Sequence, residues 1–258
     1  MKRFKKFSMV VALAAAFAFP AAAQTADEIV AKAIAARGGI EKLKSVRTEK
    51  ITGQITLGPD AQGPFSVQRE RPHKMRMEMT IQGQIILRIF NGSAGWQINP
   101  FQFQGSKEVH SLRPDELKDI AEEADFEGPL VNWREKGNQV ESMGLEKVGG
   151  RDAYHLKVTE KNGIVQNLWF DAETFRQIKW ESVRGSGDQS IDVQSFFSDF
   201  RDVGGLTEPF VIDSGLVGKD PGQKIVIERI ELNLPMDNSL FTPPVEAPST
   251  TDSKPARN

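Results

Sequence analysis

Residues 74–98, KMRMEMTIQGQIILRIFNGSAGWQI, carry the pattern that decides the fold class of this chain. Every second residue over 75–81 is apolar and the residues between are polar, which predicts a strand with one apolar face. The next apolar run, residues 85–89, ends at Asn91-Gly92, a dipeptide that favours a tight hairpin turn. Trp96 then begins a further strand. The stretch therefore predicts antiparallel strands joined by short turns.

The same period of two recurs on both sides of this stretch. It predicts strands around residues 51–57, 65–67, 75–81, 85–89, 96–98, 154–158, 168–170, 178–180, 191–193, 210–212 and 225–227. Turn signals such as Gly58-Pro59-Asp60 and Asn162-Gly163 separate several of them. A run of about ten or eleven strands with so few helices between them disfavours a parallel sheet.

A helix is expected before the first strand. Thr25 and Glu28 have the spacing of a capping box, and an apolar stripe follows over residues 29–36. Gly38-Gly39 offers the left-handed backbone geometry that ends a helix. Residues 40–44 are expected to add one more turn.

One helical insertion is expected to interrupt the strands. Residues 114–116, Pro-Asp-Glu, suit a first turn, and apolar residues recur at helical spacing as far as Ala124. A second short amphipathic helix is expected around residues 130–133. The predicted fold class is therefore α+β, mainly antiparallel strands with a helical cover.

The two ends of the chain differ from the rest in composition. Basic residues precede an uncharged apolar run, residues 7–19, that is followed by three alanines, as in a secretory signal peptide. We expect a signal peptide over residues 1–23, cleavage after Ala23 and a periplasmic mature protein. Residues 246–258 are polar and aperiodic, which predicts a disordered tail. One β domain, residues 24–245, is expected between them.

Charge and cysteine content exclude several classes of partner. The net charge is -2 at pH 7 with both signs interspersed, so no basic surface for nucleic acid is expected. The chain has no cysteine, which excludes disulfides, thiolate metal sites and an acylated cysteine anchor. His73, His110 and His155 are far apart and form no metal-binding motif, so no metal or cofactor is expected.

Catalytic signatures are missing from the sequence as well. Residues 92–95, Gly-Ser-Ala-Gly, lack the spacing of a serine nucleophile elbow and are better explained as a hairpin tip. Carboxylate pairs such as Asp115-Glu116, or Asp199 with Asp202, are typical of solvated surfaces. We therefore expect no enzyme, and a hydrolase that uses two carboxylates is the less favoured alternative.

The methionines of residues 75–79 allow two interpretations. A core-facing strand is the usual reason for such a stripe, but the flexible thioether also suits a cavity that accepts ligands of varied shape. The same two readings apply to aromatic residues such as Trp96, Trp169 and Trp180, because aromatic rings anchor cores and acyl-chain pockets alike.

Several short segments form a recognisable set across the β domain. They are GGIEKL (residues 38–43), NGSAGW (91–96), WFDAET (169–174), SDFRDVGGL (198–206) with Pro209, and LFTPP (240–244). Together they resemble the periplasmic carriers and receptors of the LolA/LolB-like lipoprotein-sorting superfamily. The resemblance implies a half-open antiparallel β-barrel whose concave apolar face is covered by helices, with acyl chains or lipoproteins bound between sheet and lid.

We therefore expect a soluble periplasmic binding protein that shields a lipid acyl chain or a lipoprotein tail in an apolar cavity. The residues expected to line that cavity are Met75, Met77, Met79, Ile85, Leu87, Ile89, Trp96, Leu117 and Ile120. Inner- or outer-membrane proteins are candidate partners. The alternative is an envelope sensor of the same fold, like the RseB-type regulators, in which exposed Phe101, Phe103 or Phe126 anchor a partner protein.

Overall fold

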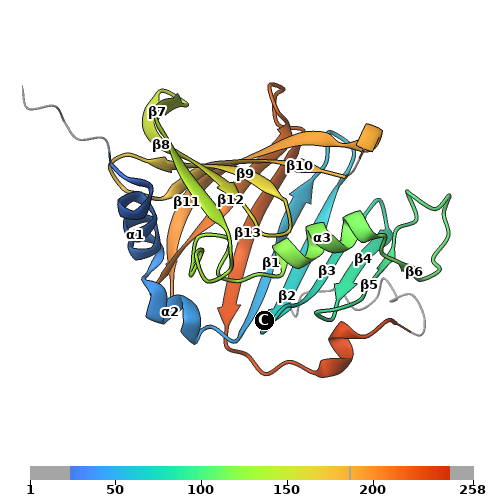
Figure 1. Cartoon of the computed structure of the whole chain (residues 1–258). Coiled ribbons are helices and arrows are strands. Elements are labelled where there is room, and N and C mark those ends of the chain that lie inside the picture. The colour runs from blue at the N-terminus through green and yellow to red at the C-terminus, as the bar shows by residue number, and fades with distance from the viewer. Residues whose placement is uncertain (1–23, 186, 245–258) are drawn as a thin grey trace, which may run out of the picture.

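A single antiparallel sheet of 13 strands forms most of the structure (Figure 1). This computed structural model describes residues 24–185 and 187–244, so the predicted signal peptide and tail lie outside the described residues. The strands are β1 (Thr48–Thr56), β2 (Gln62–Glu70), β3 (Lys74–Ile81), β4 (Gln84–Phe90), β5 (Gly95–Ile98), β6 (His110–Ser111), β7 (Gln139–Val148), β8 (Arg151–Thr159), β9 (Val165–Asp171), β10 (Gln177–Arg184), β11 (Ile191–Val203), β12 (Leu206–Leu216) and β13 (Gln223–Leu232).

The order of the strands explains why the sheet stays open. Strands β1 to β6 form one meander and β7 to β13 form another, and the two meanders join where β1 pairs with β13. As a result β6 and β7, which follow each other in the chain, lie at opposite edges of the sheet. The chain between them, residues 112–138, must cross from one edge to the other.

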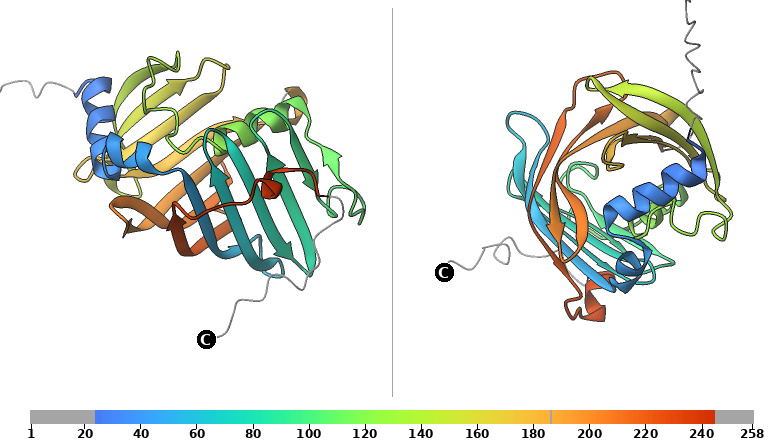
Figure 2. Two further views of the ribbon diagram at one scale, coloured as in Figure 1. Left: turned by 90° about the horizontal axis from the view of Figure 1, so that it is seen from below. Right: turned by 90° about the vertical axis from the view of Figure 1, so that its left-hand side faces the viewer.

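Three α-helices accompany the sheet in the described residues. They are α1 (Ala26–Arg37), α2 (Ile40–Ser45) and α3 (Pro114–Glu123), and two short 3-10 helices, η1 (Gly187–Gln189) and η2 (Asn238–Phe241), complete the set. None of the helices in this part of the chain is long and apolar enough to cross a membrane. Figure 2 (right) shows the sheet curling around α1, and Figure 1 shows α3 crossing in front of the sheet.

The predicted helix starts and stops are confirmed. The capping box forms, because the Glu28 amide donates to the Thr25 hydroxyl at 3.3 Å and the Thr25 amide donates to the Glu28 carboxylate at 2.9 Å. The chain leaves α1 at Gly38, and α2 supplies the extra turn. The helical insertion appears as α3, with Pro114 in its first turn.

The predicted second amphipathic helix is wrong. Residues 128–137 form successive turns, because Gly128, Asn132 and Gly137 adopt positive φ, which interrupts helical geometry. Leu130 and Val131 are nevertheless buried, so the prediction was right about burial and wrong about helical backbone.

The strand count of ten or eleven was too low. The two strands that periodicity missed are β6, which has only two residues, and β7, whose residues are mostly exposed. An exposed edge strand needs no apolar face, so it leaves little period-two signal. Strand β11 is also longer than expected and continues as far as Val203.

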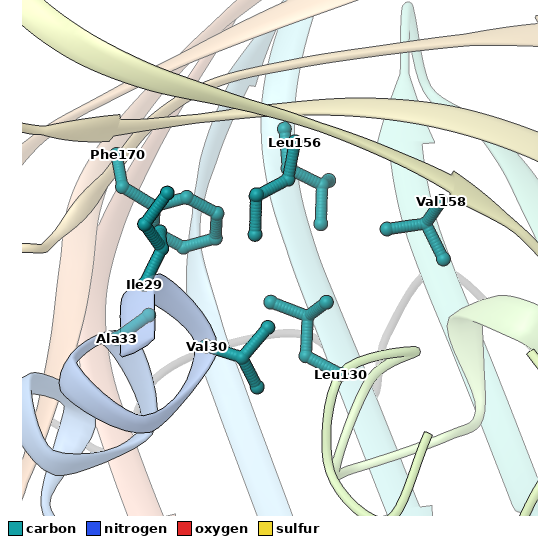
Figure 3. Close-up of a cluster of buried hydrophobic side chains, with 8 residues drawn as sticks. Ile29, Val30, Ala33, Leu130, Leu156, Val158 and Phe170 are labelled. Carbon is teal, nitrogen blue, oxygen red and sulfur yellow. The ribbon is translucent and has the colours of Figure 1, made fainter. Parts of the chain in front are cut away.

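Two apolar clusters pack helices onto the inner face of the sheet, which we define as the face that α1 and α3 cover. Residues of α1, including Ile29 and Ala33, meet Leu156 and Phe170 from β8 and β9 (Figure 3). On the other side, Ile120 of α3 packs with residues of β3 and β4. The concave face is therefore covered at two separate places.

Gly38 is the position at which α1 approaches the sheet most tightly. Its φ is +129°, and a β-carbon there would collide with the Gly205 carbonyl oxygen and lie 2.9 Å from Cδ2 of Leu206. Its neighbour Gly39 has φ +86° and open space around the same position. Substitution of Gly38 therefore introduces both a clash and backbone strain, whereas substitution of Gly39 introduces backbone strain alone.

We expect Gly38→Ala to lower the free energy of unfolding by about 2–4 kcal/mol, because it adds a clash between α1 and β12 to backbone strain. Gly39→Ala is the matched control and should cost less, about 1–3 kcal/mol, from backbone strain alone. Urea unfolding of both variants measures the difference. Equal losses would show that α1 does not dock closely at Gly38.

Candidate functional site

The nine residues predicted to line one cavity lie on two faces of the sheet. Met75, Met77 and Met79 lie on the inner face, where Leu117 and Ile120 of α3 cover the first two of them. Ile85, Leu87 and Ile89 alternate to the outer face, together with Trp96. The prediction of one shared cavity needs correction, because these four side chains point away from the other five.

The composition of β4 explains this error. Its sequence, QIILRIF, has apolar side chains on both faces, with Ile86 and Phe90 inward and Leu87 and Ile89 outward. In a continuous apolar run, apolar and polar residues do not alternate, so the sequence alone does not show which side chains face a cavity. Residues 233–244, which follow β13, cover part of the outer face (Figure 2, left). There Lys74 donates a hydrogen bond to Asn238 of η2 at 2.7 Å.

An apolar cleft of about 290 Å³ lies instead on the inner face of the sheet. Residues of α1, α2, β9 to β12 and residues 125–131 surround it. We call residues 125–131 the cover segment. The apolar side chains that line the cleft include Ala33, Ile34, Ala36, Leu43, Phe126, Leu130, Leu168, Phe170, Phe175, Phe197 and Phe200. None of the nine predicted residues is among the lining residues. The volume is near the lower end of the range of small-molecule pockets, about 300–1,000 Å³.

Phe126 is the buried aromatic residue of the cover segment. It is 6% exposed and packs with Leu43 and Val131. The guanidinium groups of Arg69 and Arg71 lie 5.2 and 5.3 Å from the centroid of its ring. The expectation that Phe126 is exposed as a partner anchor is therefore wrong, whereas Phe101 is 52% exposed.

The same two arginines also make hydrogen bonds, Arg71 to the cover segment itself and Arg69 to the end of α3 that precedes it. Arg69 pairs with Glu49 and donates to the carbonyl oxygen of Glu123 at 3.2 Å. Arg71 donates to Glu127 and to the carbonyl oxygen of Leu43, both at 2.9 Å. The contacts at this side of the cleft therefore combine apolar packing of Phe126 with cation–π contacts and hydrogen bonds from two arginines.

A third arginine ties α3 to the opposite meander. Arg184 of β10 donates to Asp119 at 3.0 Å and to the two carboxylate oxygens of Glu122 at 2.8 and 3.2 Å. Burial raises the pKa of Glu122 to about 7, because loss of hydration outweighs the attraction of Arg184. Glu160 and Glu123 add to the same upward shift. Helix α3 is thus held to β10 by Arg184 through two carboxyl groups, and the charge of one of them, Glu122, changes near neutral pH.

Two histidines outside the cleft are engaged in contacts with neighbouring side chains. Both ring nitrogens of His155 are occupied, by Glu146 at 2.8 Å and by Asn167 at 2.9 Å, and the ring stacks on Trp169. His110 stacks on Phe103 with ring centroids 3.8 Å apart. Over residues 24–185 and 187–244, no group of three or more histidine, aspartate or glutamate side chains could hold a metal ion.

Comparison with solved structures shows that the chain has a LolA-like fold. A LolA superfamily protein from Nitrosomonas europaea superposes with a TM-score of 0.55 at 20% identity, over 85% of this chain and 98% of that chain. A DUF1329 family protein from Desulfovibrio piger gives 0.55 at 13% identity, over 84% and 97%. A domain described as an outer membrane lipoprotein-sorting protein, from Vibrio parahaemolyticus, gives 0.51 at 12% identity, over 83% and 94%.

The sequence itself gives no further assignment. No protein-family profile matches it, and no curated protein matches it. At these identities the structural likeness establishes the fold, a half-open antiparallel sheet with helices over its concave face, as the sequence resemblance implied.

Sequence reasoning missed the cleft because its lining residues come from helices, strands and turns that are far apart in the chain. Phe126 and Phe175 stand outside any apolar alternation, and Arg69 lies in a strand among polar residues. The one available signal was the segment at residues 169–174, which precedes Phe175 directly. Side chains from α1, α2, β2, the cover segment and the strands β9 to β12 line the cleft together.

We expect the free energy of unfolding to fall as pH rises from about 4.5 to about 7. Between the ordinary pKa of Glu122, 4.5, and its folded value of about 7, the folded chain holds a proton that the unfolded chain has lost. The stabilisation is therefore complete below the lower value and is lost as pH passes the upper value. The slope from this one proton is at most about 1.4 kcal/mol per pH unit.

Urea unfolding at several pH values measures this slope. Glu122→Gln should remove it, because the amide does not titrate, whereas Glu41→Gln on the exposed side of α2 should leave it unchanged. The same slope in the unaltered protein and in Glu122→Gln would contradict the assignment to this carboxyl group.

Proposed function

We propose that the cleft binds an acyl chain or the lipid tail of a lipoprotein, and that the protein is an exported carrier of that chain. The observation that carries this proposal is a cleft lined largely by apolar and aromatic side chains, beside the cover segment, on the concave face of the sheet. Binding, not catalysis, is the role that suits such a site. A membrane protein that delivers or accepts the chain is a candidate partner.

The energetics favour a ligand that is long and apolar. Each methylene group removed from water contributes about 0.8 kcal/mol, before the cost of ordering the chain is subtracted. A cleft of about 290 Å³ is small for a long acyl chain. Entry of such a chain would therefore displace Phe126, which the two flanking arginines could hold again after release.

The fold and the sequence support the same proposal. The structural neighbours include a domain described as an outer membrane lipoprotein-sorting protein. The basic residues, apolar run and alanines over residues 1–23 are typical of export to the periplasm. Acyl chains in that compartment need shielding from water whenever they leave a membrane.

The direct experiment is native mass spectrometry of gently purified protein, followed by titration with a fluorescent fatty acid. We expect a co-purifying lipid, or saturable uptake of the probe by delipidated protein. Absence of both would contradict the proposal.

Filling the cleft should prevent binding. Ala36 lines the cleft, so we expect Ala36→Phe to weaken binding of the fluorescent fatty acid at least about tenfold, which corresponds to about 1.4 kcal/mol. Ala35 is exposed on the same helix, and Ala35→Phe is the matched control. Equal affinities in the two variants would show that the probe binds elsewhere.

A further inference from the structure

Phe175 has a backbone conformation that its side chain disfavours. Its φ is +56°, in the left-handed region, where a bulky residue costs about 1–3 kcal/mol and glycine costs little. The other non-glycine residues with positive φ in the described parts of the chain are polar: Gln82, Gln104, Asn132, Asp199 and Asn233. An aromatic ring at such a position therefore calls for an explanation beyond turn formation.

The turn between β9 and β10 fixes this conformation. The side chain of Asp171 accepts hydrogen bonds from the amide of Thr174 at 2.8 Å and from its hydroxyl at 2.9 Å. The Phe175 amide donates to the carbonyl oxygen of Asp171 at 2.8 Å, and the Asp171 amide donates to the carbonyl oxygen of Arg176 at 3.0 Å. The turn would accept glycine at residue 175 with less strain.

The ring of Phe175 is instead used for contacts inside the protein. It stacks on Tyr154 of β8 with centroids 5.5 Å apart and an interplanar angle of 13°. Nζ of Lys32, on α1, lies 4.8 Å from the centroid of the ring. Phe175 thus connects the turn to α1 and β8 while it lines the cleft.

The two contact partners of the Phe175 ring lie outside the lining of the cleft, and we refer to their side as the Lys32–Tyr154 end. Ala33, Ala36 and Arg37 of α1 line the cleft, but Lys32 and Tyr154 do not. The ring of Phe175 therefore stands between the open space and the Lys32–Tyr154 pair. Strained residues persist where the surrounding structure fixes them, and they are frequent at ligand-binding sites.

We propose that Phe175 closes this end of the cleft and sets the length of the apolar chain that the cleft accepts. The inference rests on the proposed function, since it concerns the same cleft. Removing the ring would open the space in front of Tyr154. A longer chain could then extend past the turn, and each further methylene buried there would strengthen binding about fourfold.

The test is competition by a series of saturated fatty acids, from octanoate to octadecanoate, against a bound fluorescent fatty acid. Phe175→Ala and Phe175→Gly should both move the preferred chain to greater length, by two or more methylene groups. Phe197→Ala is the control, because Phe197 also lines the cleft but does not contact the Lys32–Tyr154 pair. It should weaken binding of all chains without moving the preferred length.

A second measurement keeps the result interpretable if one variant folds poorly. Phe175→Gly relieves the backbone strain that Phe175→Ala retains, so it should be the more stable of the two in urea unfolding. An unchanged length preference in folded Phe175→Gly, with the probe still bound, would overturn the role of Phe175 and leave the proposed function intact. Failure of the unaltered protein to bind any chain would overturn both.

Discussion

The pairing of β1 with β13 is the constraint on which the rest of the structure depends. It joins two antiparallel meanders at their first and last strands, which leaves the strands in the middle of the sequence at the two free edges. The chain must then cross the open side of the sheet between β6 and β7. Helix α3 and the cover segment lie on this crossing, so the cover over the concave face follows from the topology.

The crossing is held by buried apolar clusters and, beside them, by hydrogen bonds and ion pairs from three arginines. Arg69 and Arg71 hold Phe126 on one side, and Arg184 holds α3 on the other. Charge-assisted hydrogen bonds depend strongly on geometry, so these arginines fix where the crossing lies on the sheet.

The sequence predicted the parts of the fold that depend on local rules. The capping box at Thr25, the turn at Asn91-Gly92 and the helix after Pro114 each result from interactions within a few residues. Strand β7 and the turns after Gly128 could not be found this way, because one has no buried face and the others need positive φ. The predicted cavity residues Ile85, Leu87 and Ile89 were placed on the wrong face for a related reason: β4 is apolar on both faces, so its inward residues cannot be distinguished by period.

Photo-crosslinking with a diazirine-bearing fatty acid, followed by mapping of the labelled peptides, tests the central claim most directly. The account predicts label in the cover segment, residues 125–131, and on β9 and the turn after it, residues 168–175, because side chains from both line the cleft. Label confined to the outer face, for example at Val226, would contradict the claim that the concave cleft holds the chain.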